Sequence, residues 1–218
     1  MDKNINIDQK LIDYIFSHTN NLHPIQNELI KFNDKLGNIK RLQISVLQAN
    51  FLQFLIKIKK IKSCLELGTF TGYSTLSMAL SLPKNGKIHT IDKDFSKSQI
   101  VQTFFKKAKL FHKLKIEISK GNEALDRLVK IKKKYDLILI DADKENYINY
   151  FNQVSNKLSK NGIIISDNVL WSGKVLDSNQ MDEETATLVQ FNKIINDNKR
   201  FKSIILPIRD GISISRLV

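Results

Sequence analysis

The sequence predicts an α/β protein with a mostly parallel sheet, preceded by helices and closed by an antiparallel hairpin. After residue 62, short apolar runs alternate with stretches long enough to be helices, a pattern typical of strand–helix–strand units. These runs are residues 63–67, 87–91, 115–119, 135–140 and 162–166. The last two runs, "KSIILPI" and "GISISRLV", have only a short connection, in which Asp210 and Gly211 favour a tight turn. The final pair should therefore be antiparallel.

Three helices are predicted before the first strand. Helical spacing of apolar residues covers 8–17 and 24–35, with Pro24 suited to the first helical position. Ser45 is a candidate N-cap for a third helix over "VLQANFLQFLIKI". A chain of 218 residues without linker or repeat fits one domain, with residues 1–58 as N-terminal helices and residues 62–218 as the core.

The net charge raises the question of an acidic partner. Lys and Arg number 35 against 22 Asp and Glu, which leaves +13 and makes nucleic acid a possible partner. The chain is also rich in Asn and Ile, so an AT-rich coding bias, which favours Lys as well, explains the charge at least as well. The basic runs 57–62, 106–115 and 130–134 all directly precede strands, so they should lie at the amino ends of the sheet.

Nothing in the sequence predicts secretion or membrane insertion. The N-terminus is charged from its second residue, and no apolar run approaches the roughly 20 residues that span a bilayer. We therefore expect a cytoplasmic protein without a membrane partner. The single cysteine, Cys64, lies within an apolar run, which excludes an intrachain disulfide and predicts a buried strand residue.

The first predicted strand ends in a glycine-containing turn, "LELGTFTGYS". Gly68 and Gly72 frame it and would let backbone approach a ligand at the start of a helix near Tyr73, although simple turn chemistry is an alternative. Glu66 before the turn would repel a phosphate but could pair with a cationic amino group. Asp92 ends the second strand, 20 residues beyond Gly72, where an acid can accept hydrogen bonds from ribose hydroxyls. An adenosine ligand with a positive tail, such as S-adenosylmethionine, fits better than NAD.

A second group of acids follows the fourth and fifth strands. Asp141 ends one strand, and Asp167 with Asn168 ends the next. Neighbouring parallel strands lie about 4.8 Å apart, so these side chains can converge. Two carboxylates and an amide oxygen suit Mg²⁺, with Mn²⁺ or Ca²⁺ as alternatives. Each acid taken alone could instead be an ordinary strand-end residue or helix cap.

Four segments together resemble one enzyme family. They are "LELGTFTGYSTLSMALSLP", "IDADKENYINYF", "SDNVLWSGKV" and "LPIRDGISISR". These are similar to the motifs of the cation-dependent O-methyltransferases, the group of caffeoyl-CoA O-methyltransferases and their bacterial relatives, with catechol O-methyltransferase more distant. The resemblance covers roughly residues 8–218. It implies a Rossmann-like, S-adenosylmethionine-dependent fold with seven strands, the last of them antiparallel.

The resemblance also implies roles for individual residues. The metal ligands would be Asp141, Asp167 and Asn168. Lys144 would remove the acceptor proton beside Asp141. The family's cofactor contacts fall on Glu66, Gly68, Thr69, Ser74, Asp92 and Asp143, to which the glycine turn adds Gly72, and its acceptor contacts fall on Tyr150 and Ser172. Trp171 and Tyr147 are further candidates for the acceptor pocket, although core packing would explain either.

The implied reaction is methylation of a hydroxyl on a small phenolic, catechol-like acceptor. Two alternatives stay open. Some bacterial members of this broad family methylate a hydroxylated uridine in tRNA, which the net charge favours, and a non-catalytic binding module could keep the fold. The acceptor would depend on the leading helices and on residues 172–182. The resemblance also implies a homodimer, which is common in the family, and the apolar faces of residues 8–35 could supply its interface.

Overall fold

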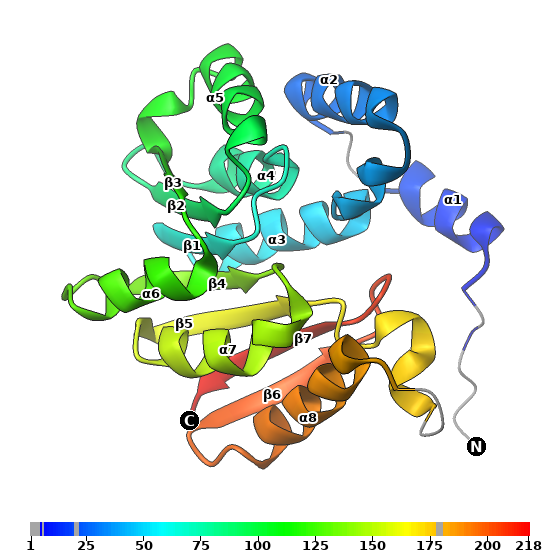
Figure 1. Ribbon diagram of the computed structural model, residues 1–218. Coiled ribbons are helices and arrows are strands. Elements are labelled where there is room, and N and C mark those ends of the chain that lie inside the picture. The colour runs from blue at the N-terminus through cyan, green and yellow to red at the C-terminus, as the bar shows by residue number, and fades with distance from the viewer. Residues whose placement is uncertain (1–4, 6, 20–21, 178–180) are drawn as a thin grey trace.

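A seven-stranded sheet in the order β3-β2-β1-β4-β5-β7-β6 forms the centre of the computed structural model, which describes residues 5, 7–19, 22–177 and 181–218 (Figure 1). The strands are β1 (Ser63–Leu67), β2 (Lys87–Asp92), β3 (Leu114–Ile118), β4 (Tyr135–Ile140), β5 (Leu158–Asp167), β6 (Phe201–Leu206) and β7 (Ile212–Leu217). The first five are parallel, whereas β7 pairs antiparallel with both β5 and β6. The predicted fold class, including its closing hairpin, is confirmed.

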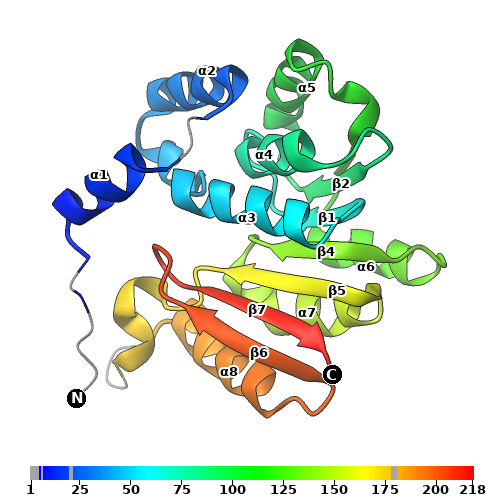
Figure 2. The ribbon, with the colours of Figure 1, turned by 180° about the vertical axis from the view of Figure 1, so that it is seen from behind.

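Helices cover both faces of this sheet. They are α1 (Gln9–Ser17), α2 (Pro24–Asn33), α3 (Val46–Ile58), α4 (Tyr73–Ser81), α5 (Ser98–Lys107), α6 (Gly121–Val129), α7 (Tyr147–Ser155) and α8 (Glu183–Asp197). Helices α3, α4 and α5 pack on one face, and α6, α7 and α8 pack on the other (Figures 1 and 2). In the described part of the chain, no helix has the length and apolar character needed to cross a bilayer.

The helix starts predicted at Pro24 and Ser45 are confirmed. Pro24 opens α2, and the Ser45 side chain accepts a hydrogen bond from the Gln48 amide at the start of α3. The Gln48 side chain accepts a bond from the Ser45 amide in return, which completes a capping box. The sequence did not predict the 3₁₀ segment η1 (Asp34–Leu42) that joins these helices and bends at Gly37. The other 3₁₀ segments are η2 (Phe95–Lys97), η3 (Phe111–Lys113), η4 (Lys144–Asn146) and η5 (Trp171–Leu176).

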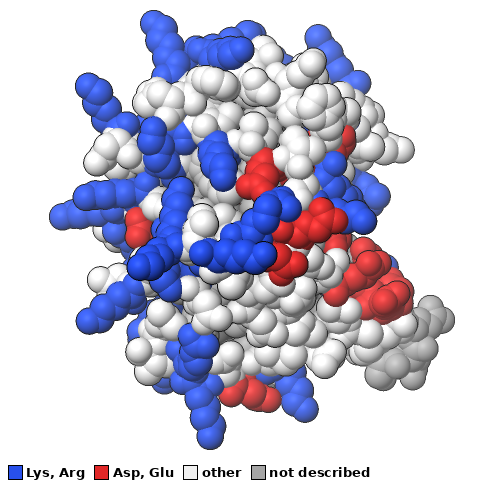
Figure 3. Space-filling model, turned by 60° about the vertical axis from the view of Figure 1, so that its left-hand side comes forward, with Lys and Arg blue, Asp and Glu red and all other residues white. Residues whose placement is uncertain are grey.

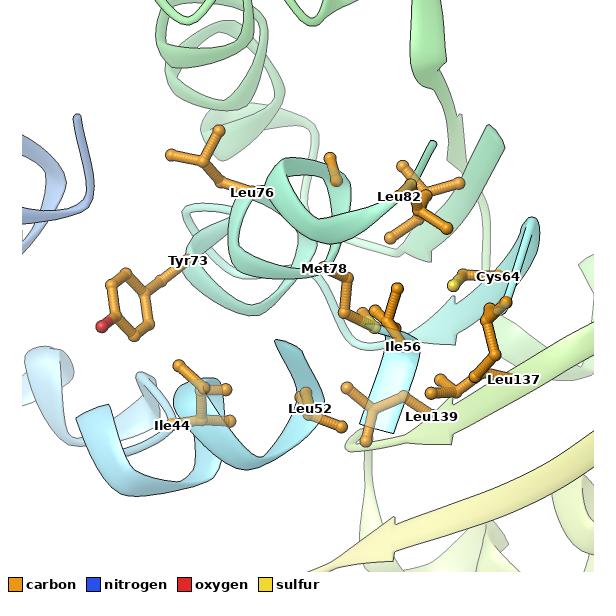
Figure 4. Close-up of a cluster of buried hydrophobic side chains, with 14 of the residues drawn as sticks. Ile44, Leu52, Ile56, Cys64, Tyr73, Leu76, Met78, Leu82, Leu137 and Leu139 are labelled. Carbon is orange, nitrogen blue, oxygen red and sulfur yellow. The ribbon is translucent and has the colours of Figure 1, made fainter. Parts of the chain in front are cut away.

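The core consists of one apolar layer on each side of the sheet. Figure 4 shows the layer beneath α3 and α4, where Leu52 and Ile56 lie near Cys64, Leu137 and Leu139. Cys64 is fully buried, as predicted, and burial raises the pKa of its thiol. Near the helix ends, Ile44 and Tyr73 close this layer, and the Tyr73 hydroxyl points away from the other labelled side chains.

Strand β5 is longer than the predicted run of residues 162–166. It begins at Leu158, which pairs with Tyr135, and the register then shifts before Leu137 pairs with Ile163. The polar residues 159–161 carry no apolar signal, so sequence pattern alone could not reveal this extension. The hairpin connection is likewise longer than predicted and occupies residues 207–211.

Backbone hydrogen bonds join the carboxyl end of β1 to those of β4 and β2. The Asp141 amide donates to the Leu67 carbonyl at 2.8 Å, and the Gly68 amide donates to the Ile91 carbonyl at 2.9 Å. Gly68 has a φ of +93°, and a Cβ placed there would lie 1.9 Å from the Asp141 carbonyl oxygen. Only glycine satisfies both the backbone angle and this contact. The packing thereby fixes where the loop after β1 meets Asp141.

We expect Gly68→Ala to destabilise the protein by at least about 4 kcal/mol, because backbone must move to relieve the clash. Gly173 is a matched control, since it also has a positive φ, +81°, but a Cβ placed there would meet no atom within 4 Å. Gly173→Ala should therefore cost only about 1–2 kcal/mol. Urea unfolding measures both values, and equal losses for the two variants would contradict the role given to the Gly68 contact.

Candidate active site

A cleft of about 970 Å³ lies at the carboxyl ends of the parallel strands. Loops after β1, β2, β4 and β5 line it, which is where open α/β sheets bind ligands. Most of the predicted site residues meet there: Gly68, Thr69, Ser74, Asp92, Asp141, Asp143, Lys144, Tyr150, Asp167, Asn168, Trp171 and Ser172. Glu66 and Gly72 were also predicted for this site, but neither belongs to the lining of the cleft.

Asp92 organises the glycine turn. One of its carboxylate oxygens accepts the amides of Thr69 at 2.7 Å and Phe70 at 2.9 Å, while the other accepts the Asp94 amide at 2.9 Å. Gly72, with φ of +84°, then turns the chain into α4. The loop after β1 is thus fastened to the end of β2, and both face the cleft.

Glu66 is a buried acid next to this turn. Its Oε2 accepts hydrogen bonds from the hydroxyls of Thr75 at 2.5 Å and Thr90 at 2.6 Å, while Oε1 is buried without a partner among the described residues. Burial raises the pKa of Glu66 to about 7, although hydrogen bonds from neighbouring hydroxyls oppose the rise. The carboxyl group therefore lies behind the cleft lining with one oxygen still able to accept a bond.

Asp143 and Tyr150 form a second polar pair. The Tyr150 hydroxyl donates to Asp143 Oδ1 at 2.8 Å, and Asn146 donates to the other oxygen. Burial acts to raise the pKa of Asp143, but these two hydrogen bonds lower it overall. A methyl group at Gly121 would lie 2.6 Å from the Tyr150 hydroxyl, so this ring packs against the start of α6. Tyr150 therefore lies beside a predicted cofactor residue.

Asp141 and Asp167 end adjacent strands, as predicted. Asp167 is 4% exposed, and its Oδ1 accepts bonds from the Gln48 side chain at 2.6 Å and the Asn168 amide at 2.7 Å. Burial and the neighbouring charge of Asp141 raise the pKa of Asp167 to about 7, even though the positive charges of Lys144 and Arg209 oppose this. Asn168 has a φ of 58°, a left-handed conformation that asparagine tolerates.

Lys144 is buried next to this acidic pair. It is 6% exposed, and its Nζ lies 2.6 Å from the Tyr147 hydroxyl and 3.4 Å from Asp141 Oδ1. The Tyr147 hydroxyl in turn donates toward the carbonyls of Ile140 and Asp167, at 3.2 and 2.9 Å. Tyr147 is thus a buried support for Lys144 and does not line the cleft. The Lys144 ammonium also lies 5.9 Å from the centre of the Trp171 ring, which does line it.

The hairpin closes the opposite wall of the cleft. The Ser172 amide donates to Asp210, and the Arg209 guanidinium donates to the Gln43 carbonyl at 3.0 Å. The sequence did not predict three contacts that support this site: those of Gln48 with Asp167, of Arg209 with Gln43, and of Tyr147 with Lys144. In the sequence Gln48 is recognisable only as a capping residue, because its bond to Asp167 joins positions 119 residues apart. Residues 178–180 of the predicted acceptor segment lie outside the described residues.

Several buried polar atoms around the cleft have no partner in the described structure. They are Glu66 Oε1, the Tyr73 hydroxyl and Trp171 Nε1. A buried polar group without a hydrogen bond costs about 1–3 kcal/mol, so such atoms mark places where a ligand can supply partners. Glu66 Oε1 is the kind of acceptor that the positively charged amino group of S-adenosylmethionine requires, and it lies behind the cleft lining next to the Gly68 turn.

We expect Glu66 to make the free energy of unfolding depend on pH in EDTA and without cofactor. Its folded pKa of about 7 exceeds the unfolded value of about 4.3, so the folded state holds the extra proton. The stabilisation that this proton gives the folded state is complete below pH 4.3 and is lost as the pH rises through 7. The free energy of unfolding falls by up to about 1.4 kcal/mol per pH unit. Glu66→Gln should flatten that decline, measured by urea unfolding. The exposed Glu123→Gln is the control, and equal slopes in all three proteins would refute the assignment.

The chain matches the model of an O-methyltransferase family over residues 16–218. It is 37% identical over 184 residues to a flavonoid 3',5'-methyltransferase of Vitis vinifera, covering 80% of this chain and 78% of that one. Caffeoyl-CoA O-methyltransferase 1 of Arabidopsis thaliana is 33% identical over 180 residues, with coverages of 78% and 70%. An O-methyltransferase from Bacillus cereus, solved with S-adenosylhomocysteine, superposes with a TM-score of 0.87 at 25% identity, covering 94% and 96%. The protein therefore belongs to the caffeoyl-CoA O-methyltransferase-like family of S-adenosylmethionine-dependent O-methyltransferases.

Proposed function

We propose that this methyltransferase depends on a divalent cation and methylates one hydroxyl of a small, catechol-like acceptor. The observation that carries the proposal is the pair of acids at the ends of β4 and β5. Burial and mutual repulsion raise the pKa of Asp167 to about 7, so this arrangement is costly unless a positive charge offsets it. A cation bound between Asp141, Asp167 and Asn168 would do so.

The available donors fit a hard cation. The proposed donor set of Asp141, Asp167 and Asn168 contains no Cys or His, which are the usual zinc ligands. Two carboxylates and the amide oxygen of Asn168 are instead oxygen donors, as Mg²⁺, Mn²⁺ and Ca²⁺ require. Such a set leaves coordination positions for two neighbouring oxygens of an acceptor. This is why a vicinal dihydroxy aromatic is the proposed acceptor class.

The residues of the chain divide the work of the reaction. Gly68, Thr69, Ser74, Asp92 and Asp143 would hold S-adenosylmethionine, which supplies the electrophilic methyl group. A bound cation supplies a Lewis acid that favours ionisation of the acceptor hydroxyl. Lys144 Nζ, next to Asp141, would accept the hydroxyl proton. The Tyr147 hydroxyl, anchored to two backbone carbonyls, holds that nitrogen in place at 2.6 Å.

The walls of the cleft would orient the acceptor. Trp171 offers an aromatic surface beside Lys144, and Ser172 is held at the mouth by its bond to Asp210. Holding two reactants in the productive geometry can contribute on the order of 7–11 kcal/mol to lowering the barrier. Tyr150 contributes indirectly, because its hydroxyl orients Asp143 on the cofactor side.

The distribution of charge favours a small acceptor over tRNA. Because β7 runs antiparallel to β5, the C-terminus lies at the amino ends of the parallel strands, on the left side of Figure 1. Figure 3 brings this side forward and shows Lys and Arg spread widely over it. The cleft at the other end has seven acids in its lining against five cationic side chains, and the acids include Asp92, Asp141, Asp143 and Asp167. A phosphate backbone attracted to the basic face would therefore lie away from the reacting groups.

We expect methyl transfer from labelled S-adenosylmethionine to catechol with Mg²⁺, and none in EDTA. Asp141→Ala should reduce the rate by about 100-fold or more, because it removes a proposed metal ligand, while S-adenosylmethionine binding persists in calorimetry. Asp126→Asn, an acid on the outer side of α6, is the control. Near-normal rates for Asp141→Ala would contradict the metal assignment, and labelling confined to hydroxyuridine-containing tRNA would contradict the acceptor class.

We expect Lys144→Gln to lower kcat by about 100-fold or more, because the proposed base is absent. Lys144→Arg separates this role from ion pairing, since a guanidinium keeps the positive charge beside Asp141 but does not release a proton at working pH. Both variants should be comparably slow in steady-state assays at saturating S-adenosylmethionine. A rate for Lys144→Arg close to that of the unchanged enzyme would show that Lys144 acts only through its charge.

A further inference from the structure

A second cavity of about 720 Å³ adjoins the active-site cleft. Residues Asn33 to Ser45, which include η1, form most of its wall, and Arg209 from the β6–β7 connection completes it. The two cavities are neighbours, because the same four residues line both: Arg41, Gln43, Ile44 and Arg209. An acceptor in the cleft that reaches past Arg209 would therefore enter this second cavity.

The second cavity is positively charged. Three cationic side chains line it, Lys40, Arg41 and Arg209, against one acid, Asp34. Lys40 and Asp34 pair with each other at 3.5 Å and are both exposed, so they largely cancel. The two arginines are left as the net charge. The Arg41 guanidinium makes no hydrogen bond or ion pair to any other described residue.

Arg209 is exposed, and one hydrogen bond orients its guanidinium. Its Nη1 donates to the Gln43 carbonyl at 3.0 Å, which links the β6–β7 connection to the segment before α3. Arg209 itself has a φ of 52°, and the next residue, Asp210, accepts the Ser172 amide. A guanidinium has five N–H donors, so one bond to Gln43 leaves four for a ligand. A fixed guanidinium loses less conformational entropy on binding than a free one.

We propose that the natural acceptor carries an anionic group, a carboxylate or a phosphate, that occupies the second cavity and pairs with Arg41 and Arg209. This inference rests on the proposed function, because it requires the reacting hydroxyls to lie at Asp141, Asp167 and Asn168. The chemistry points to an oxyanion, since the planar guanidinium matches carboxylate and phosphate oxygens with two parallel hydrogen bonds. The acidic half of the cleft would bind the reacting hydroxyls, and the basic half would select acceptors by their anionic tail.

The experiment compares acids with their neutral amides on the same dihydroxyphenyl ring. The acceptors are 3,4-dihydroxybenzoate, 3,4-dihydroxycinnamate and the amide of each, with a phosphate ester of 3,4-dihydroxyphenylethanol as the phosphate arm. At low salt, kcat/KM should favour at least one anionic acceptor over its neutral partner by about tenfold, which corresponds to one charge-assisted pair. The two chain lengths test how far the second cavity lies from the reacting hydroxyls.

Arg41→Gln and Arg209→Gln should each reduce that ratio toward 1, and 0.5 M salt should weaken it in the unchanged enzyme. Arg200→Gln is the matched control, because Arg200 lies beside the start of β6, away from both cavities, and its ratio should stay unchanged. Equal kcat/KM for anionic and neutral acceptors, or a preference that survives both arginine substitutions, would overturn the proposed anionic group. The proposed function would stand in either case. Absence of methylation of every acceptor would overturn the proposed function and this proposal with it.

Discussion

The contact between Gly68 and the Asp141 carbonyl is the constraint on which the site depends. At this point the loop after β1 passes the end of β4 so closely that even a methyl group would overlap the carbonyl oxygen, at 1.9 Å. The contact places the glycine turn and the acids after β4 on either side of one cleft. Cofactor residues and metal-ligand candidates can therefore act on the same small volume, because the hydrogen bond from the Asp141 amide to the Leu67 carbonyl keeps the two backbones together.

Each acid at this edge of the sheet has different hydrogen-bond donors to offset the cost of its burial. Backbone amides satisfy Asp92, hydroxyl groups satisfy one oxygen of Glu66, and side chains of Asn146 and Tyr150 satisfy Asp143. Asp167 also has two donors, but burial and the nearby charge of Asp141 still raise its pKa to about 7. Asp141 and Asp167 therefore still repel each other, and they lie where the cation is proposed. A bound cation would stabilise this pair, as is common at functional sites.

The opposite edge of the sheet uses positive charge for structural purposes. The buried Lys113 donates to the carbonyls of Ala79 and Leu82 at the end of α4, and Lys157 donates to those of Val129 and Ile131 at the end of α6. Both lysines satisfy carbonyl groups that a helix end leaves without partners. Part of the positive charge that suggests a nucleic-acid partner is thus explained by two helix ends in the fold.

The sequence by itself determined the alternation of strands and helices, the antiparallel end, the helix starts at Pro24 and Ser45, and the positions of most cleft residues. It could do so because apolar periodicity, caps and strand-end acids are local signals, and because parallel strands bring their carboxyl ends to one edge. Only the tertiary structure decided that Gln48 supports Asp167, that Tyr147 supports Lys144, and that Arg209 joins the segment after η1 to the hairpin. Two of these contacts join residues more than 100 positions apart, and all three depend on side-chain packing that no local pattern encodes. The same reason explains why η1 and the cavity that it lines went unpredicted.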